Sequence, residues 1–277
     1  MSGRNFMELL RDRWANGTCV CVGLDSELER IPSAAQLLGI AETILAFNQK
    51  IVDATNDLVC AFKPNVAFYE AYGNGGIAAL KQTIAYIHTV APDVPVILDA
   101  KRGDIGSTNA GYVEAAFSFL QVDAITVHPY LGAEALQPFL ARAEKGIIVL
   151  CRTSNPGAGE FQDLSVNRGE PLYRFVARRV AGVWNKNGNC ALVVGATYPD
   201  ELREVRGLVG DMPILIPGVG AQGGDVEKTV KAGKDSRGQG MIVNSSRSII
   251  FASSGPDFAE AARRETLKLR DQINQHL

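Results

Sequence analysis

Short, almost uniformly apolar runs alternate along this chain with longer segments in which apolar residues recur every three or four positions. The short runs are rich in β-branched residues and lack the alternation of apolar and polar residues that is typical of a strand with one solvent-exposed face. They therefore predict parallel strands that are covered on both faces. Eight runs show this pattern: residues 18–25, 58–64, 94–101, 123–129, 146–154, 190–197, 213–220 and 240–246.

The longer segments carry the spacing of amphipathic helices. Residues 41–55, for example, place Ile44, Phe47 and Ile51 on one face. The same spacing predicts helices over residues 76–90, 108–120, 172–184 and 257–274.

Eight strand–helix units in a row favour one of two α/β architectures, a (β/α)8 TIM barrel or a doubly wound sheet. The strand count and the length of 277 residues favour the barrel. No Pro/Ser-rich linker divides the chain, so residues 1–277 are expected to form a single domain. Residues 155–170 and 233–240 are too polar for a core and predict surface loops, the first of which could move over a site.

Composition and charge exclude several classes of protein. Hydrophobic residues make up 46% of the chain and charged residues 21%, which is typical of a globular protein with a large core. The formal net charge is −2 and no basic patch occurs, which argues against a nucleic-acid partner, because duplex binding depends on phosphate neutralisation. No apolar stretch reaches the roughly 18 residues of a membrane span, and the amphipathic N-terminus MSGRNFMELLRDRW lacks the apolar core of a secretory signal.

The cysteines indicate the compartment. All five lie in or beside apolar runs, and none forms a C-x-x-C pair. Cys19 and Cys21 would share one strand face, so a metal pair is an alternative there, but buried reduced thiols fit the pattern better. No Cys/His or His/His spacing indicates zinc. We therefore expect a cytoplasmic protein with no metal site and no membrane partner.

Polar side chains follow nearly every predicted strand. In a barrel the carboxyl ends of the strands meet at one mouth, where catalytic groups lie. Strand ends also meet solvent, so one or two such residues would mean nothing, whereas a whole ring of them indicates a site. The residues in question are Asp25, Lys63, Asp99, Lys101, His128, Ser154, Thr197, Gln222 and Arg247.

The stretch LDAKRGDIGSTNAGY, residues 98–112, concentrates the charge of this ring. Asp99 and Lys101 are two residues apart, so on a regular strand they project to the same face. Lys63 ends the preceding strand, which is adjacent in a barrel, and the three side chains would alternate in sign. A structural ion-pair cluster is the alternative to a catalytic one. Asp104 lies beyond Gly103, where the chain leaves the strand, and need not point the same way.

A phosphate site is predicted independently. PGVGAQGGD, residues 217–225, and NSSRSI, residues 244–249, end the seventh and eighth strands, and this pair of loops is the usual phosphate site of a barrel. Glycines allow backbone N–H groups to approach phosphate oxygens, and Arg247 adds a bidentate cation. His128 ends the fourth predicted strand beside Pro129 and is either catalytic or structural, and we favour the structural interpretation.

Taken together, FKPN (62–65), residues 98–112, TSNPGA (153–158), PGVGAQGGD and SRSI (246–249) resemble the orotidine 5′-phosphate decarboxylase family, in its long-chain bacterial branch. The motifs occur in the family's order and span most of the chain. The resemblance implies a TIM barrel, the small-molecule substrate orotidine 5′-phosphate, no cofactor, and the last step of de novo UMP biosynthesis.

The resemblance also implies roles for single residues. Lys63, Asp99, Lys101 and Asp104 correspond to the family's alternating charged network, with Lys101 as the proton donor to C6 of the pyrimidine. Asp104 and Thr108 would reach across a homodimer into the partner's site. The remaining implied substrate contacts are Asp25 to a ribose hydroxyl, Ser154 to the pyrimidine edge, and Pro217, Gln222 and Arg247 around the phosphate. Residues 159–171 and 233–240 receive no role.

Two other functions stay open on this scaffold. The D-x-K-x-x-D element also occurs in magnesium-dependent decarboxylases and aldolases of sugar phosphates. Lys63 argues against this alternative, because it places a cation where Mg²⁺ would need a carboxylate ligand. A non-catalytic barrel that binds a phosphate ligand is the second alternative. A barrel that only binds its ligand would not explain why Lys101 lies between the two acidic residues Asp99 and Asp104.

Overall fold

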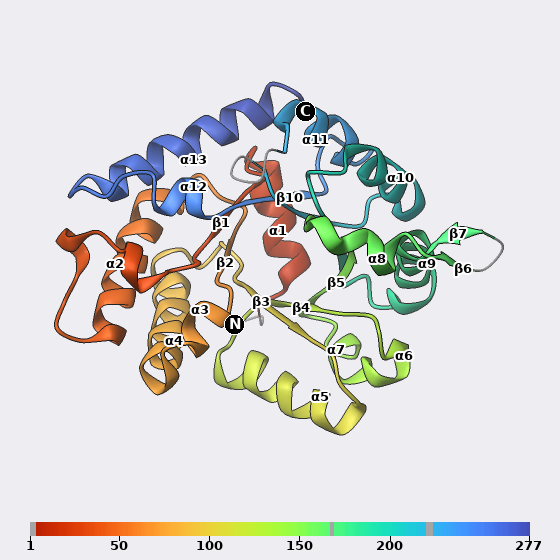
Figure 1. The fold of residues 1–277 in the computed structure, drawn as a ribbon, viewed down its shortest axis with the longest axis horizontal. Coiled ribbons are helices and arrows are strands. Elements are labelled where there is room, and N and C mark those ends of the chain that lie inside the picture. The colour runs from red at the N-terminus through yellow and green to blue at the C-terminus, as the bar shows by residue number, and fades with distance from the viewer. Residues whose placement is uncertain (1–3, 167–168, 220–223) are drawn as a thin grey trace.

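The computed structural model describes residues 4–166, 169–219 and 224–277. Its main sheet has eight parallel strands in the order β2-β1-β10-β9-β8-β5-β4-β3, ringed by helices (Figure 1). The strands are β1 (Val20–Gly23), β2 (Ala61–Lys63), β3 (Ile97–Arg102), β4 (Ala124–Val127), β5 (Gly146–Arg152), β8 (Cys190–Val194), β9 (Ile214–Pro217) and β10 (Met241–Ser245). All eight fall inside the runs that the sequence predicted, apart from one residue of β3.

The sheet closes between its first and last strands. Phe62 on β2 bridges Val96, just before β3, and Asn65 bridges Asp99. The amide of Asp99 also donates to the carbonyl of Pro64 at 2.9 Å. The predicted (β/α)8 TIM barrel is therefore confirmed, and β2 and β3, which carry the predicted lysine–aspartate row, are neighbours in it.

Helices fill the connections between the strands. They are α2 (Ile40–Thr55), α3 (Ala67–Glu70), α4 (Gly73–Val90), α5 (Gly106–Val113), α6 (Gly132–Ala135), α7 (Gln137–Leu140), α9 (Leu172–Arg179), α10 (Pro199–Val209), α11 (Val226–Gly233), α12 (Arg247–Ile250) and α13 (Phe258–Asn274). Two of them, α5 and α9, continue as π-helical turns, over Glu114–Phe119 and Val180–Trp184. All the segments predicted as helices are helical.

Helix α1 (Phe6–Ala15) closes the amino-terminal end of the barrel and crosses the centre of the ring in Figure 1. Phe6, Leu10 and Trp14 on its inner face are buried. The indole of Trp14 donates to the carbonyl of Met241 at the start of β10, at 2.7 Å. Gly146, at the start of β5, has no room for a side chain, because a Cβ there would lie 2.3 Å from Phe6. A ligand must therefore enter from the opposite end, where the strands finish.

The polar segment after β5 is more ordered than the predicted surface loop. It forms a single turn, α8 (Gly159–Gln162), and an antiparallel hairpin of β6 (Ser165–Val166) and β7 (Glu170–Pro171), which projects beside α9 (Figure 1). Elements this short leave no periodic signal in a sequence. The other predicted surface loop, residues 233–240, folds around the buried Asp235, whose carboxylate accepts hydrogen bonds from the amides of Arg237 and Gln239.

All five cysteines are free and buried, as expected. Across the described ranges, no helix is both long enough and apolar enough to span a membrane.

Candidate active site

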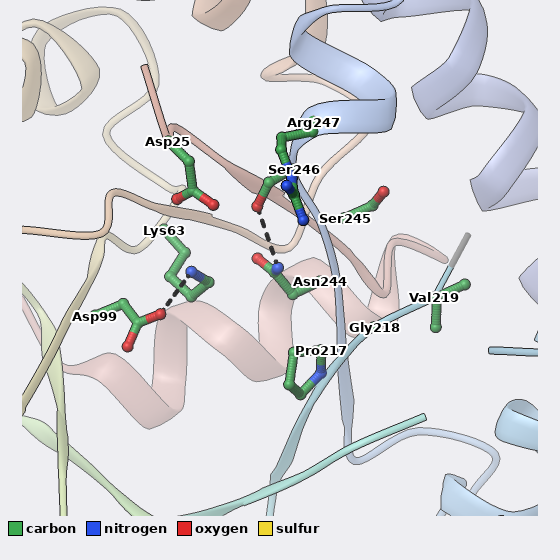
Figure 2. Close-up of a pocket in the computed structure, with 10 residues that line it drawn as sticks. All are labelled: Asp25, Lys63, Asp99, Pro217, Gly218, Val219, Asn244, Ser245, Ser246 and Arg247. Atoms are coloured by element: carbon green, nitrogen blue, oxygen red, sulfur yellow. Dashed lines mark hydrogen bonds and ion pairs between the residues drawn. The ribbon is translucent and has the colours of Figure 1, made fainter. Parts of the chain in front are cut away.

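Two cavities meet at the mouth of the barrel. The larger, of about 440 Å³, is lined by Lys63, Asp99, Lys101, Thr126, Leu150, Thr153, Ser154, Asn155, Gln162, Val193, Leu215 and Pro217. The smaller, of about 170 Å³, is lined by Asp25, Lys63, Asp99, Pro217, Gly218, Val219, Asn244, Ser245, Ser246 and Arg247 (Figure 2). Lys63, Asp99 and Pro217 border both, so the charged residues stand at the junction of one elongated site.

Asp99 holds a lysine on each of its carboxylate oxygens. Nζ of Lys63 donates to Oδ2 at 2.9 Å, and Nζ of Lys101 donates to Oδ1 at 2.6 Å. The two lysines differ in exposure, because the side chain of Lys63 is 4% exposed and that of Lys101 is 50% exposed. The chain therefore places one buried and one accessible ammonium on the same carboxylate.

Burial and charge act in opposite directions on this cluster. Burial alone would raise the pKa of Asp99, but the charges of Lys63 and Lys101 outweigh it and hold that pKa well below its usual value. Burial likewise favours a neutral Lys63, but Asp99 and Asp25 outweigh it and raise the pKa of that lysine. At neutral pH the site therefore contains an ionised Asp99 and a charged Lys63.

The backbone between Asp99 and Lys101 is not a regular strand. The pairing of β3 with β4 shifts register between Leu98 and Arg102, and Lys101 has φ +47°. The expected proximity of Asp99 and Lys101 is therefore present, but the expected reason, a common face of the pleat, is wrong. A β-bulge brings the two side chains together instead.

The small cavity carries features suited to a ribose phosphate. Oδ1 of Asp25 is buried and has no hydrogen-bond partner among the described residues, so it is ready to accept from a ligand hydroxyl. Arg247 begins α12 and is exposed at the cavity rim. Ser246, beside it, packs so closely on Gly23 that any Cβ at Gly23 would collide with its hydroxyl.

The loop after β9 bends sharply where a phosphate was predicted to bind. Gly218 has φ +96°, a conformation that favours glycine, and its carbonyl accepts from the amide of Gly224 at 3.2 Å. Pro217 lines both cavities. Gln222 lies outside the described residues, so its predicted phosphate contact stays a prediction.

Ser154 lies in the wall of the larger cavity, between two close contacts of its chain segment. Gly195 lets its backbone approach, because a Cβ there would lie 2.7 Å from the Cβ of Ser154. Thr153, which precedes Ser154, makes two hydrogen bonds with Gln162. Oε1 of Gln162 accepts from the Thr153 amide at 2.9 Å, and Nε2 of Gln162 donates to the Thr153 hydroxyl at 2.8 Å. Sequence reasoning missed Gln162, since it lies in a polar segment without a motif.

Asp104 and Thr108 line neither cavity of their own chain. Oδ1 of Asp104 accepts from the amide of Ile105 at 2.6 Å, at the start of α5, and Thr108 is exposed on that helix. The structure therefore brings Lys63, Asp99 and Lys101 together and leaves Asp104 apart.

His128 packs against Gly103, where a Cβ would lie 2.7 Å from the His128 ring. Nδ1 of His128 accepts a hydrogen bond from the amide of Tyr130 at 3.3 Å, and these contacts suit a structural role.

Two further cavity residues were missed from the sequence. Asn244 lines the small cavity, and its Oδ1 is buried without a partner among the described residues. Thr126 lines the large cavity from β4. Over residues 4–166, 169–219 and 224–277, no group of three or more His, Cys, Asp or Glu side chains is arranged to hold a metal ion.

Comparison with known proteins shows similarity over nearly the whole chain. The model of the family described as orotidine 5′-phosphate decarboxylase / HUMPS matches residues 18–264. The curated orotidine 5′-phosphate decarboxylase of Cellvibrio japonicus (strain Ueda107) is 53% identical over 271 residues, 98% of each chain. That of Ralstonia pickettii (strain 12J) is 54% identical, again over 98% of each chain. The solved Leishmania donovani OMP decarboxylase is 37% identical with a TM-score of 0.81, covering 96% of this chain and 99% of that one.

Proposed function

This chain belongs to the orotidine 5′-phosphate decarboxylase family and is a carboxy-lyase that converts orotidine 5′-phosphate to UMP and CO2, and we propose that Lys101 supplies the proton to C6. The observation that carries the proposal is the ion-paired series Lys63, Asp99, Lys101 at the junction of the two cavities. The larger cavity would hold the pyrimidine and the smaller one the ribose phosphate.

Loss of CO2 leaves the bonding electron pair on C6, in an orbital in the plane of the ring. The ring π system cannot delocalise that pair, so the charge must be stabilised electrostatically and then protonated. The Lys101 ammonium would do both, since Asp99 holds it at 2.6 Å. Its Nζ loses a proton to C6 and becomes a neutral amine. Because its side chain is half exposed, water can return that proton.

Lys63 would serve a different purpose from Lys101. Its ammonium is buried and donates to the other oxygen of Asp99 at 2.9 Å. It keeps Asp99 ionised, so the carboxylate can orient Lys101 without taking its proton. The reaction would need no cofactor, because the ammonium at the reacting carbon supplies the stabilisation for which other decarboxylases use an organic electron sink.

The other end of the substrate would be held by the small cavity. Asp25 would accept a hydrogen bond from a ribose hydroxyl through its unpartnered oxygen. Arg247, with Pro217 and Gln222, would hold the phosphate, and Ser154 would contact the pyrimidine edge. Binding energy from the phosphate would favour a closed site in which the charges act more strongly.

The chain would act as a single domain, residues 1–277, that forms a homodimer with shared sites. Asp104 and Thr108 line neither cavity of their own chain, as expected of residues that contribute to a partner's site. Ile105, next to Asp104, is 59% exposed, and Tyr130 on the neighbouring loop is 87% exposed, so this edge of the mouth offers apolar surface to a second copy. Neither nucleic acid nor a membrane would be a partner. The five free, buried thiols suit the reducing cytoplasm.

A single assay tests the activity. The purified protein is mixed with orotidine 5′-phosphate, and loss of the substrate is followed by ultraviolet absorbance with and without EDTA. Turnover that is equal in both conditions supports the proposal. Turnover that EDTA abolishes would instead indicate a magnesium-dependent enzyme, and UMP binding without any turnover would indicate a non-catalytic barrel.

A further inference from the structure

Thr126 on β4 uses every hydrogen bond that its hydroxyl can make. Its Oγ1 accepts from the amide of Ala100 at 3.0 Å and from the amide of Lys101 at 2.9 Å. A hydroxyl has two acceptor lone pairs and one proton. The remaining proton is therefore donated to Oδ1 of Asp99, at 3.0 Å. Thr126 is 1% exposed, so water does not replace any of these partners.

These three bonds sit in the bulge of β3. The strands pair Leu98 with Ile125 and then Arg102 with Val127, so three residues of β3 face Thr126 alone. The register gives Ala100 and Lys101 no paired residue on β4, and their amides donate to the side chain of Thr126 instead. The threonine hydroxyl takes the place of the missing ladder partner, so the buried amide of Ala100 and the partly buried amide of Lys101 are both paired.

The bulge is also where the reactive lysine is held in an uncommon backbone conformation. Lys101 has φ +47°, which a side chain with a Cβ adopts only when its surroundings impose it. The hydrogen bond from its amide to Thr126 is part of that restraint. The bond from Thr126 to Asp99 also fixes the carboxylate oxygen that binds Nζ of Lys101 at 2.6 Å.

We propose that Thr126 is a positioning residue for the reaction, whose hydroxyl sets both the backbone of Lys101 and the carboxylate of Asp99. This inference rests on the proposed role of Lys101. The hydroxyl acts through Asp99 and Lys101 and need not touch the substrate. Its removal would leave the charges in place but let the ammonium move relative to C6.

Substitutions at Thr126 separate the hydroxyl from the methyl group. Thr126→Ser keeps the hydroxyl, Thr126→Val keeps the shape, and Thr126→Ala keeps neither. We expect kcat to fall roughly 10- to 100-fold in the valine and alanine variants, since misplacement of a reacting group by about 1 Å has effects of this size. The serine variant should retain at least several times the kcat of either. Thr266→Val is the matched control, because it removes a buried threonine hydroxyl that donates to the carbonyl of Ala262 within α13.

A structural role is distinguished by titration with UMP. Calorimetry gives the number of competent sites per chain and the Kd for UMP, and kcat is then expressed per competent site. The inference requires UMP stoichiometry near wild type, Kd within about threefold, and a lowered kcat per site. A loss of kcat that disappears after correction for competent sites would overturn it.

Other outcomes also decide the matter. If Thr126→Val does not fold, the serine and alanine variants alone isolate the hydroxyl, because both lack the methyl group. A kcat in Thr126→Ala within threefold of wild type, or an equal loss in Thr126→Ser and Thr126→Ala, would overturn the inference. An inactive wild-type protein would reject the proposed function itself, whereas an active wild type with an unaffected alanine variant rejects only the role of Thr126.

Discussion

Lys63 and Lys101 bind opposite oxygens of one carboxylate, yet one is buried and the other half exposed. Oδ2 of Asp99 accepts from Lys63 at 2.9 Å, and Oδ1 accepts from Lys101 at 2.6 Å. The side chains of the two lysines are 4% and 50% exposed. Because Lys63 is buried, it can act as a fixed counter-charge for Asp99. Because Lys101 is half exposed, it can exchange protons with a ligand and with water.

Asp99→Asn should destabilise the fold in a pH-dependent way. The substitution leaves Lys63 buried without its main counter-charge, which costs about 3 kcal/mol of unfolding free energy at pH 7. The folded-state pKa of Asp99 is depressed, so its contribution is fully present above the unfolded pKa of about 3.9 and is lost as the pH falls through the folded-state pKa. Urea unfolding of both proteins from pH 7 to pH 3 measures this difference.

The difference in unfolding free energy between wild type and Asp99→Asn should be constant from pH 7 to pH 5 and should shrink below about pH 4. Asp57→Asn is a suitable comparison, because it removes a lowered-pKa carboxylate from an exposed ion pair with Arg263, where the loss should be about 1 kcal/mol or less. A difference for Asp99→Asn that grew on acidification would contradict the direction of its pKa shift.

Arg247→Ala should weaken recognition of the phosphate. We expect a loss of about 2–4 kcal/mol in kcat/KM for orotidine 5′-phosphate, because a charge-assisted contact is removed. For orotidine without its phosphate the loss should nearly vanish. Arg203→Ala on α10 is the control, since that exposed arginine pairs with Asp200 and lines neither cavity. Equal losses on both substrates would mean that Arg247 supports the fold.

Gln162→Ala should loosen the wall that carries Ser154. The two hydrogen bonds between Gln162 and Thr153 are lost, and kcat/KM should fall by a factor that corresponds to about 1–2 kcal/mol. Steady-state kinetics measure the loss, and Gln82→Ala, at an exposed position of α4, provides the baseline. Unchanged kinetics would show that the segment after β5 does not hold the pyrimidine contact in place.

Subunit mixing tests the shared site. Lys101→Ala and Asp104→Ala should each be nearly inactive alone. When the two are unfolded, mixed equally and refolded, about half of the dimers are mixed, and each mixed dimer has one site without either lesion. Roughly a quarter of wild-type activity should then return. No recovery, with mixed dimers confirmed by mass, would assign Asp104 to the site of its own chain.

Much of the fold could be predicted because parallel barrel strands are buried on both faces and read as continuous apolar runs. The Lys63 and Asp99 row could also be predicted, since consecutive strands are neighbours in a barrel. The bulge at Lys101 could not be predicted, because the Lys101 amide donates its hydrogen bond to the hydroxyl of Thr126, which is 25 residues away along the chain. Gln162 was beyond prediction for a related reason, because its bonds to Thr153 exist only once the short turn α8 has folded back.

The proposed role of Lys101 as proton donor is tested most directly by Lys101→Ala. The variant is assayed for loss of orotidine 5′-phosphate by ultraviolet absorbance and for UMP binding by calorimetry, beside wild type. An interaction made only in the transition state should affect kcat. We predict that kcat falls by several orders of magnitude while the Kd for UMP stays within roughly tenfold. A variant that retains a tenth of wild-type turnover, with UMP binding intact, would contradict Lys101 as the proton donor.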